Sequence, residues 1–181
     1  MSLLGLVRRG SAAIAALILT AGLAIAADSA IELDWDELIP SDWRPEAALD
    51  RLLSDAVALS DDDPRAMELM AEMEAMWADA PVVESLDGRR VKLPGYVVPL
   101  DMERTRINEF LLVPYFGACI HVPPPPANQT VYVRTEPNKA YRGNLYDVVW
   151  VTGVLSVKPK TSELGHAGYT IAAQTVEPYD P

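Results

Sequence analysis

The chain has 181 residues, half of them hydrophobic, and its 15 basic and 26 acidic side chains give a formal net charge of −11. This length is enough for one domain with a substantial core. The acidic balance argues against nucleic acid as a partner, because nucleic acid is bound by neutralising its phosphates. A single cysteine excludes an internal disulfide.

The first 26 residues have the pattern of a cleavable secretory signal. Arg8 and Arg9 precede an uncharged apolar run, Ala12 to Ala26, which ends in small residues that signal peptidase accepts. The run is shorter than the roughly 20 residues of a membrane span, and it holds no cysteine for lipid attachment. We therefore predict export to the periplasm, removal of residues 1–26, and no stable membrane anchor.

Residues 27–79 are expected to form an N-terminal arm and two helices. Apolar residues recur at helical spacing from Pro45 to Leu59 and from Arg65 to Ala78. Methionine thioethers can bind copper(I), but a spacing of three residues drifts around a helix, and a broad apolar face is typical of packing. We interpret the second helix as packed against the fold through its methionines, which are Met67, Met70, Met73 and Met76.

From residue 80 onward the pattern changes to strands. The sequence predicts a strand at Val82-Val83 with a hairpin turn at Asp87-Gly88, and further strands over 91–97, 107–113, 130–134, 146–157 and 168–176. About five strands joined by loops predict a mainly β fold: a small antiparallel, partly open β-barrel resembling the OB-fold. The two helices would form its N-terminal cap. The barrel would occupy 80–181, and 27–181 would be one globular unit.

The most unusual segment places Cys119 and His121 directly before four prolines. In an extended chain both side chains would project from one face, with their Cα atoms about 6.6 Å apart. Thiolate and imidazole together suit zinc, but two ligands do not complete a site. His166 is a candidate for a third ligand. A buried structural pair is the alternative, and the residues alone leave both interpretations open.

The prolines, Pro123, Pro124, Pro125 and Pro126, predict a polyproline II segment. Such a segment is preorganised, so these prolines and Asn128 are candidate partner-binding residues. The alternative is a stiff loop that closes the barrel rim. We expect no catalytic residues, because no phosphate loop or nucleophile elbow is present. The rival hypothesis is a thiol-dependent enzyme that uses Cys119.

Several motifs together resemble an exported bacterial family, domain of unknown function 3299. They are Leu86-Asp87-Gly88, Pro94-Gly95-Tyr96-Val97-Val98-Pro99-Leu100, Glu109-Phe110-Leu111-Leu112-Val113-Pro114-Tyr115 and the string Gly117-Ala118-Cys119-Ile120-His121-Val122 with its four prolines. The resemblance covers residues 34–177. It implies no activity. It does imply a periplasmic accessory role beside a transporter component or another periplasmic protein, in a metal-linked system in which zinc would be the metal.

Overall fold

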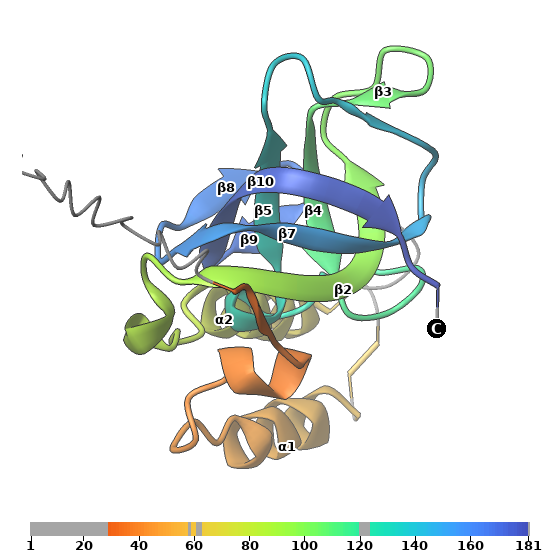
Figure 1. The fold of residues 1–181 in the computed structure, drawn as a ribbon. Helices are drawn as coiled ribbons and strands as arrows, with labels where there is room; N and C mark the ends of the chain where they lie inside the picture. Colours follow the sequence, from red (N-terminus) through yellow and green to blue (C-terminus); the bar gives the residue numbers. More distant parts are fainter. Residues whose placement is uncertain (1–28, 58, 61–62, 120–123, 181) are drawn as a thin grey trace, which may run out of the picture.

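The computed structural model describes residues 29–57, 59–60, 63–119 and 124–180. The predicted signal segment, His121 and Pro123 lie outside the described residues. Strands predominate in the described part, and two α-helices come before most of them (Figure 1). None of the helices in this part is long and apolar enough to cross a membrane.

Five strands form a closed barrel, in the order β2-β4-β5-β10-β7 with β7 pairing back onto β2. Their bounds are β2 Arg90–Pro99, β4 Glu109–Val113, β5 Val131–Thr135, β7 Val148–Ser156 and β10 Tyr169–Pro178. The strand β10 lies between β5 and β7, parallel to the first and antiparallel to the second. The mainly β barrel is therefore confirmed, but the barrel is closed rather than partly open, and one of its pairs is parallel.

Alternating side chains fill the interior of this barrel. Strand residues point to opposite faces in turn, so each long strand sends every second side chain into the core. Gly153 lets β7 approach β10 closely, because a Cβ there would lie 2.3 Å from the backbone oxygen of Ala172. The buried inward residues of β2, β7 and β10 include Val91, Leu93, Val97, Val149, Val151, Leu155, Tyr169, Ile171 and Ala173.

An N-terminal arm is tied to the barrel by hydrogen bonds and one buried side chain. Its short strand β1 (Ile31–Glu32) pairs in parallel with β2, and η1 (Trp35–Leu38) follows. Trp35 Nε1 donates to the carbonyl of Pro94 at 2.8 Å. The hydroxyl of Tyr169 donates to the carbonyl of Leu38 at 2.7 Å, and Leu38 is fully buried.

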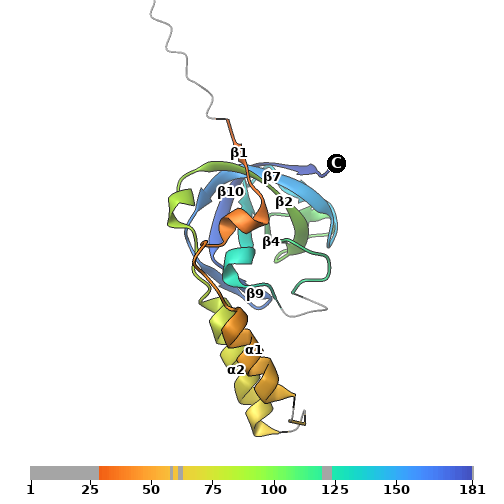
Figure 2. The same ribbon diagram turned by 90° about the horizontal axis from the view of Figure 1, so that it is seen from below.

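The two helices, α1 (Glu46–Ala56) and α2 (Pro64–Ala78), pack on each other as a hairpin that projects from the barrel (Figure 2). The side chain of Asp63 accepts from the backbone N–H of Arg65 at 2.9 Å and caps α2, with Pro64 in its first turn. The helices lie where the sequence predicts them. Because α2 contacts the rest of the fold at β9 (Gly165–Ala167), their role as a barrel cap stays a prediction.

Smaller elements complete the described part. Two ribbons are formed by β3 (Arg106–Ile107) with β6 (Tyr141–Arg142) and by β8 (Lys160–Ser162) with β9. Two 3-10 turns are η2 (Glu84–Leu86) and η3 (Ala127–Gln129). The expected hairpin around Asp87-Gly88 is wrong, because η2 follows Val83 and the turn leads into β2, whose start pairs with β7.

Candidate functional site

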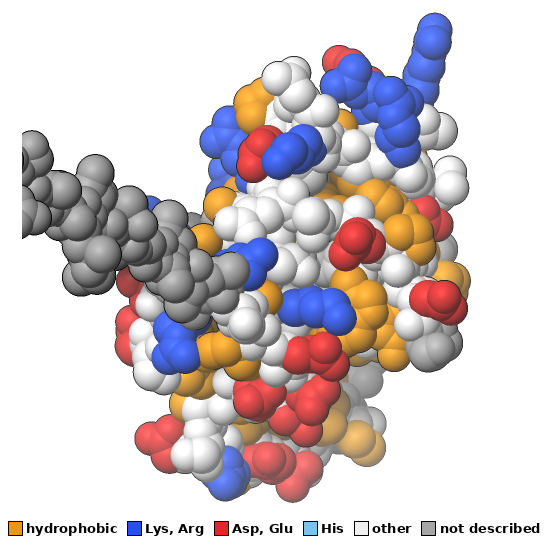
Figure 3. All heavy atoms as spheres, in the orientation of Figure 1, with side chains coloured by type: hydrophobic (Ala, Val, Ile, Leu, Met, Phe, Trp, Pro, Cys, Tyr) orange, Lys and Arg blue, Asp and Glu red, His pale blue; other side chains and the backbone are white. Residues whose placement is uncertain are grey.

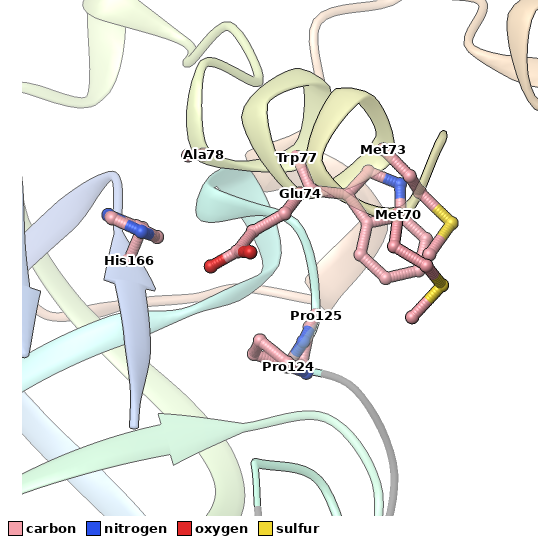
Figure 4. Close-up of a pocket in the computed structure, with 8 residues that line it drawn as sticks. All are labelled: Met70, Met73, Glu74, Trp77, Ala78, Pro124, Pro125 and His166. Carbon is pink, nitrogen blue, oxygen red and sulfur yellow. The ribbon is translucent and has the colours of Figure 1, made fainter. Parts of the chain in front are cut away.

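A groove lies where the C-terminal half of α2 faces the proline segment and β9 (Figure 4). Its volume is about 250 Å³, and a cavity of about 150 Å³ already holds benzene. The indole of Trp77 and the thioether of Met70 lie on one side of this space, and Pro124 and Pro125 on the other. The groove is lined by Met70, Met73, Glu74, Trp77, Ala78, Pro124, Pro125 and His166.

This groove continues along the helical hairpin, between α1 and α2. The second stretch has a volume of about 540 Å³ and shares Met70, Met73 and Glu74 with the first. It adds apolar side chains from both helices, among them Leu53 and Met67. We call the continuous surface the methionine groove and define it by Leu53, Met67, Met70, Met73, Trp77 and Pro124.

The apolar side chains of this groove are unusually exposed. Helix α2 has fifteen residues and buries none of them. Met67 is 72% exposed and Met70 is 60% exposed, and Leu53 on α1 is 52% exposed. The packing interpretation is therefore wrong for Met67 and Met70, because a single partner helix covers only one side of α2. Contiguous apolar side chains left in water are typical of a surface that another molecule covers.

The methionine groove sits in an acidic part of the molecule. Residues 44–79 hold ten acidic and three basic side chains. Figure 3 shows Asp and Glu side chains gathered toward the end that carries α1 and α2. Glu74 lines both stretches of the groove, so a carboxylate stands beside the exposed methionines. This charge favours a cationic ligand.

Cys119 lies in the loop after β4, where it is half-buried. Its φ of 68° is uncommon for a residue other than glycine, so the surrounding structure must hold this conformation. Burial raises the pKa of the Cys119 thiol to about 11. The thiol is therefore protonated at neutral pH, and a protonated thiol is neither a nucleophile nor a metal ligand until it loses its proton.

The loop that carries Cys119 packs on the outer face of the barrel against β9. The hydroxyl of Tyr146 donates to the carbonyl of Ala118 at 3.0 Å and fixes the backbone beside the cysteine. A methyl group placed on Gly165 would lie 4.0 Å from Cys119 Sγ and 3.1 Å from Pro124 Cβ. The cysteine loop and the proline segment thus approach the same residue of β9.

His166 lies on the other face of β9. Side chains alternate along a strand, so His166 faces the methionine groove while its neighbour Ala167 joins the apolar cluster that contains Cys119. Thr161 Oγ1 lies 3.2 Å from His166 Nδ1. Among the residues that the structure describes, no group of three or more His, Cys, Asp or Glu side chains could hold a metal ion. The pair of Cys119 with His121 stays a prediction.

The candidate partner-binding residues separate into two positions. Pro124 and Pro125 line the methionine groove, and Pro126 precedes η3. Asn128 is fully buried, and its Nδ2 donates to the carbonyl of Pro81 at 2.9 Å. In that position Asn128 ties η3 to the chain at Pro81 and does not line the groove.

Sequence reasoning missed Glu74 and Trp77 as groove residues. A signal for them was present, because positions three, four and seven residues apart share one face of a helix. Trp77 follows Met70 by seven residues and Glu74 by three. The helical pattern therefore groups these three side chains, but it does not reveal that the grouped face is uncovered.

Comparison with known proteins identifies the family. The chain belongs to the DUF3299 family of proteins of unknown function, whose model matches residues 35–178. It is similar to the crystal structure of a DUF3299 family protein from Pseudomonas aeruginosa PAO1, with 43% sequence identity and a TM-score of 0.64. The match covers 84% of this chain and 98% of that one. No curated protein matches significantly. The resemblance inferred from the sequence motifs is confirmed.

Proposed function

We propose that this protein is a non-enzymatic binding module that recognises a helical segment of a partner protein in the methionine groove. The observation that carries the proposal is α2, a fifteen-residue helix without a buried residue that lines an apolar groove ending at Pro124 and Pro125. Two packed helices bury too little apolar surface to be self-sufficient, because helices gain most of their stability from tertiary packing. A third helix laid into the groove would supply that packing.

The side chains of the groove suit such a ligand. Methionine is unbranched and polarisable, so it adapts to differently shaped apolar side chains. Met67, Met70 and Leu53 are each more than half exposed in the free protein. Full burial of one such side chain contributes about 1.5–3 kcal/mol. Burial of what is still exposed of these three side chains therefore contributes about 3–5 kcal/mol, and the apolar face of the ligand must add its own burial to offset the entropy cost of association.

Charge selects the class of helix. The excess of acidic side chains in residues 44–79 disfavours a second copy of this chain, because two such hairpins would repel each other. It favours a basic amphipathic helix, whose lysines and arginines would lie near Glu74 and the other carboxylates while its apolar face enters the groove. The partner we infer is therefore a protein with an exposed, basic amphipathic helix.

Titration with a synthetic peptide tests this proposal. The probe is a basic amphipathic helix of leucine and lysine, about 18 residues or five turns long, and the comparison peptide carries glutamate in place of lysine. Salt at about 0.3 M screens exposed charges, so calorimetry then reports binding that depends on the apolar face. We expect saturable binding of the basic peptide with a dissociation constant in the micromolar range, and weaker binding of the acidic peptide by a margin that widens as the salt concentration is lowered.

Two variants of α2 locate the binding surface. Met70→Glu places a carboxylate in the groove, and we expect it to weaken peptide binding by at least about tenfold, because a charge would be buried without a partner. Ala75→Glu adds the same charge to an exposed position of α2 that does not line the groove, and it should change affinity by less than about threefold. Equal binding by both variants, or no binding to the unmodified protein, would refute the proposal.

The cellular setting remains that suggested by the sequence. We propose a periplasmic location and a role as accessory to a metal-linked transporter system, with a transporter component or another periplasmic protein as the source of the recognised helix. The signal-like segment before residue 27 and the family resemblance support this setting. Fractionation of cells with mass spectrometry of the N-terminus tests it: an intact N-terminus in the membrane fraction would refute it.

We also propose that the barrel is of the OB type. Its strand order, with the third and fifth barrel strands parallel and the first strand paired with the second and fourth, supports that assignment. The rival function, a thiol-dependent enzyme, has less support. Burial raises the pKa of Cys119 to about 11, whereas a catalytic thiol needs a lowered pKa.

A further inference from the structure

The ribbon formed by β3 and β6 carries positive charge at the end of the molecule away from the helices. Arg106 and Arg142 stand directly opposite each other in this ribbon. Arg104 lies in the adjoining tight turn with φ 63°, and all three arginines are exposed. Figure 3 shows Lys and Arg side chains gathered at the end of the molecule that carries β3 in Figure 1, and α1 and α2 lie at the opposite end.

This arrangement is unfavourable in the protein by itself. Like charges directly opposite each other in an antiparallel pair are destabilising, and a bulky residue other than glycine at positive φ adds strain. No carboxylate in the described part of the chain forms an ion pair with Arg104, Arg106 or Arg142. A ligand that carries several negative charges would remove the repulsion.

The acidic residues nearest the ribbon are largely engaged elsewhere. Asp101 accepts from the backbone N–H groups of Asn108 and Glu109, at 3.0 and 2.8 Å. Asp147 accepts from the hydroxyl of Tyr141 at 2.9 Å. Glu136 pairs with Lys139, which leaves Glu103, in the same turn as Arg104, as the exposed carboxylate beside the three arginines.

Exposed apolar side chains flank the basic ribbon. Met102 precedes the turn and is 46% exposed, and Leu145 follows β6 and is 42% exposed. The backbone N–H of Gly143 donates to the carbonyl of Thr105 at 3.0 Å, which holds these two segments together. Basic side chains beside exposed apolar ones are the composition of surfaces that bind the interface of an anionic membrane.

We infer that the β3–β6 ribbon docks reversibly on an anionic phospholipid surface, with its arginines on lipid phosphates and Met102 and Leu145 in the headgroup region. Arginine matches phosphate oxygens through paired N–H donors. The acidic hairpin would point away from the membrane, where screening beyond about 8 Å at physiological salt limits its repulsion. The methionine groove would stay open to its partner, but this inference does not depend on that function.

Vesicle binding tests the inference. The full chain is mixed with vesicles of phosphatidylcholine, with or without about 30% phosphatidylglycerol, and sedimented. Binding to the neutral vesicles is subtracted, and any attraction of Arg8 and Arg9 to the anionic lipid cancels in the comparison of matched variants below, because all of them carry the same residues 1–28. We expect binding that requires the anionic lipid, that is lost at about 0.5 M salt, and that inorganic phosphate at about 10 mM does not displace, because single phosphates lack the clustered charge and the apolar layer.

Paired variants assign the surface. Replacing both Arg106 and Arg142 with serine should weaken anionic vesicle binding by about 25-fold, or about fivefold per arginine. The control replaces Arg51 and Arg65, two exposed arginines of the hairpin, with serine and should leave binding unchanged. Circular dichroism confirms that both pairs of variants are folded. Equal loss in both pairs, binding without a need for anionic lipid, or full displacement by inorganic phosphate would each overturn the inference. None of these outcomes bears on peptide binding by the methionine groove.

Discussion

The reactivity of Cys119 distinguishes a structural thiol from a catalytic one. A pKa of about 11 leaves about one thiol in 10⁴ ionised at pH 7, whereas a free cysteine of pKa about 8.5 has about one in 30. Because the thiolate is the reacting species, native Cys119 should react about 300-fold more slowly than the same residue in the unfolded chain. The native rate should rise about tenfold for each pH unit between pH 7 and 10.

An aromatic disulfide reagent measures both rates by absorbance, in native buffer and in concentrated urea, with a chelator present. Cys119 is the only cysteine, so there is no competing thiol, and Cys119→Ser serves as the blank. A native rate within about tenfold of the unfolded rate at pH 7, or a pH profile that levels off below pH 8, would indicate a lowered pKa. Either result would refute our reasoning and favour the thiol-dependent enzyme.

Two further predictions concern the N-terminal arm and the metal hypothesis. The buried hydroxyl of Tyr169 accepts from the backbone N–H of Val83 at 2.6 Å and donates to Leu38, so Tyr169→Phe should lower the free energy of unfolding in urea by about 2–4 kcal/mol; a loss below about 0.5 kcal/mol would contradict this linkage. If Cys119 and His121 bind zinc, calorimetry at about 0.3 M salt should show one saturable site that weakens from pH 7 to 5. That site should be lost in Cys119→Ser and in His121→Ala, and its retention in both would exclude these ligands.

Local patterns predicted the elements better than their arrangement. The apolar run at 146–157 and the alternation at 168–176 gave β7 and β10 almost to the residue, because side-chain burial sets a period of two. Barrel closure could not be predicted in this way. It depends on the pairing of β2 with β7, and the paired residues of these two strands are about 60 positions apart in the chain. The parallel pairing of β5 with β10 has the same long-range origin.

The candidate site could be predicted in part. The prolines were recognised as candidates because proline is rigid in any context, and two of them line the groove. The exposure of Met67 and Met70 was not predictable, since the same apolar spacing describes a packed helix face and an uncovered one. Only the packing of α1 against α2, which is tertiary structure, decides whether this face of α2 is covered or exposed. The pairing of Arg106 with Arg142 likewise depends on register and not on local sequence.

The geometry of β9 connects the cysteine loop to the methionine groove. Gly165 has φ +150°, and a Cβ there would lie 3.1 Å from Pro124 Cβ, so a larger side chain must displace a proline that lines the groove. We therefore expect Gly165→Val to weaken binding of the basic peptide by about fivefold or more, although it adds no charge and does not itself line the groove. Strain at positive φ would also cost about 1–3 kcal/mol of stability.

A matched substitution separates displacement of the proline from backbone strain. Gly88 has φ +73° and open space around its missing Cβ, so Gly88→Val introduces strain far from the groove without pushing on Pro124. Urea unfolding should show that both variants are destabilised, whereas calorimetry should show weaker peptide binding for Gly165→Val alone. If both variants bind the peptide as the unmodified protein does, the position of Pro124 is irrelevant to recognition. The link from the cysteine loop through β9 to the groove would then be wrong.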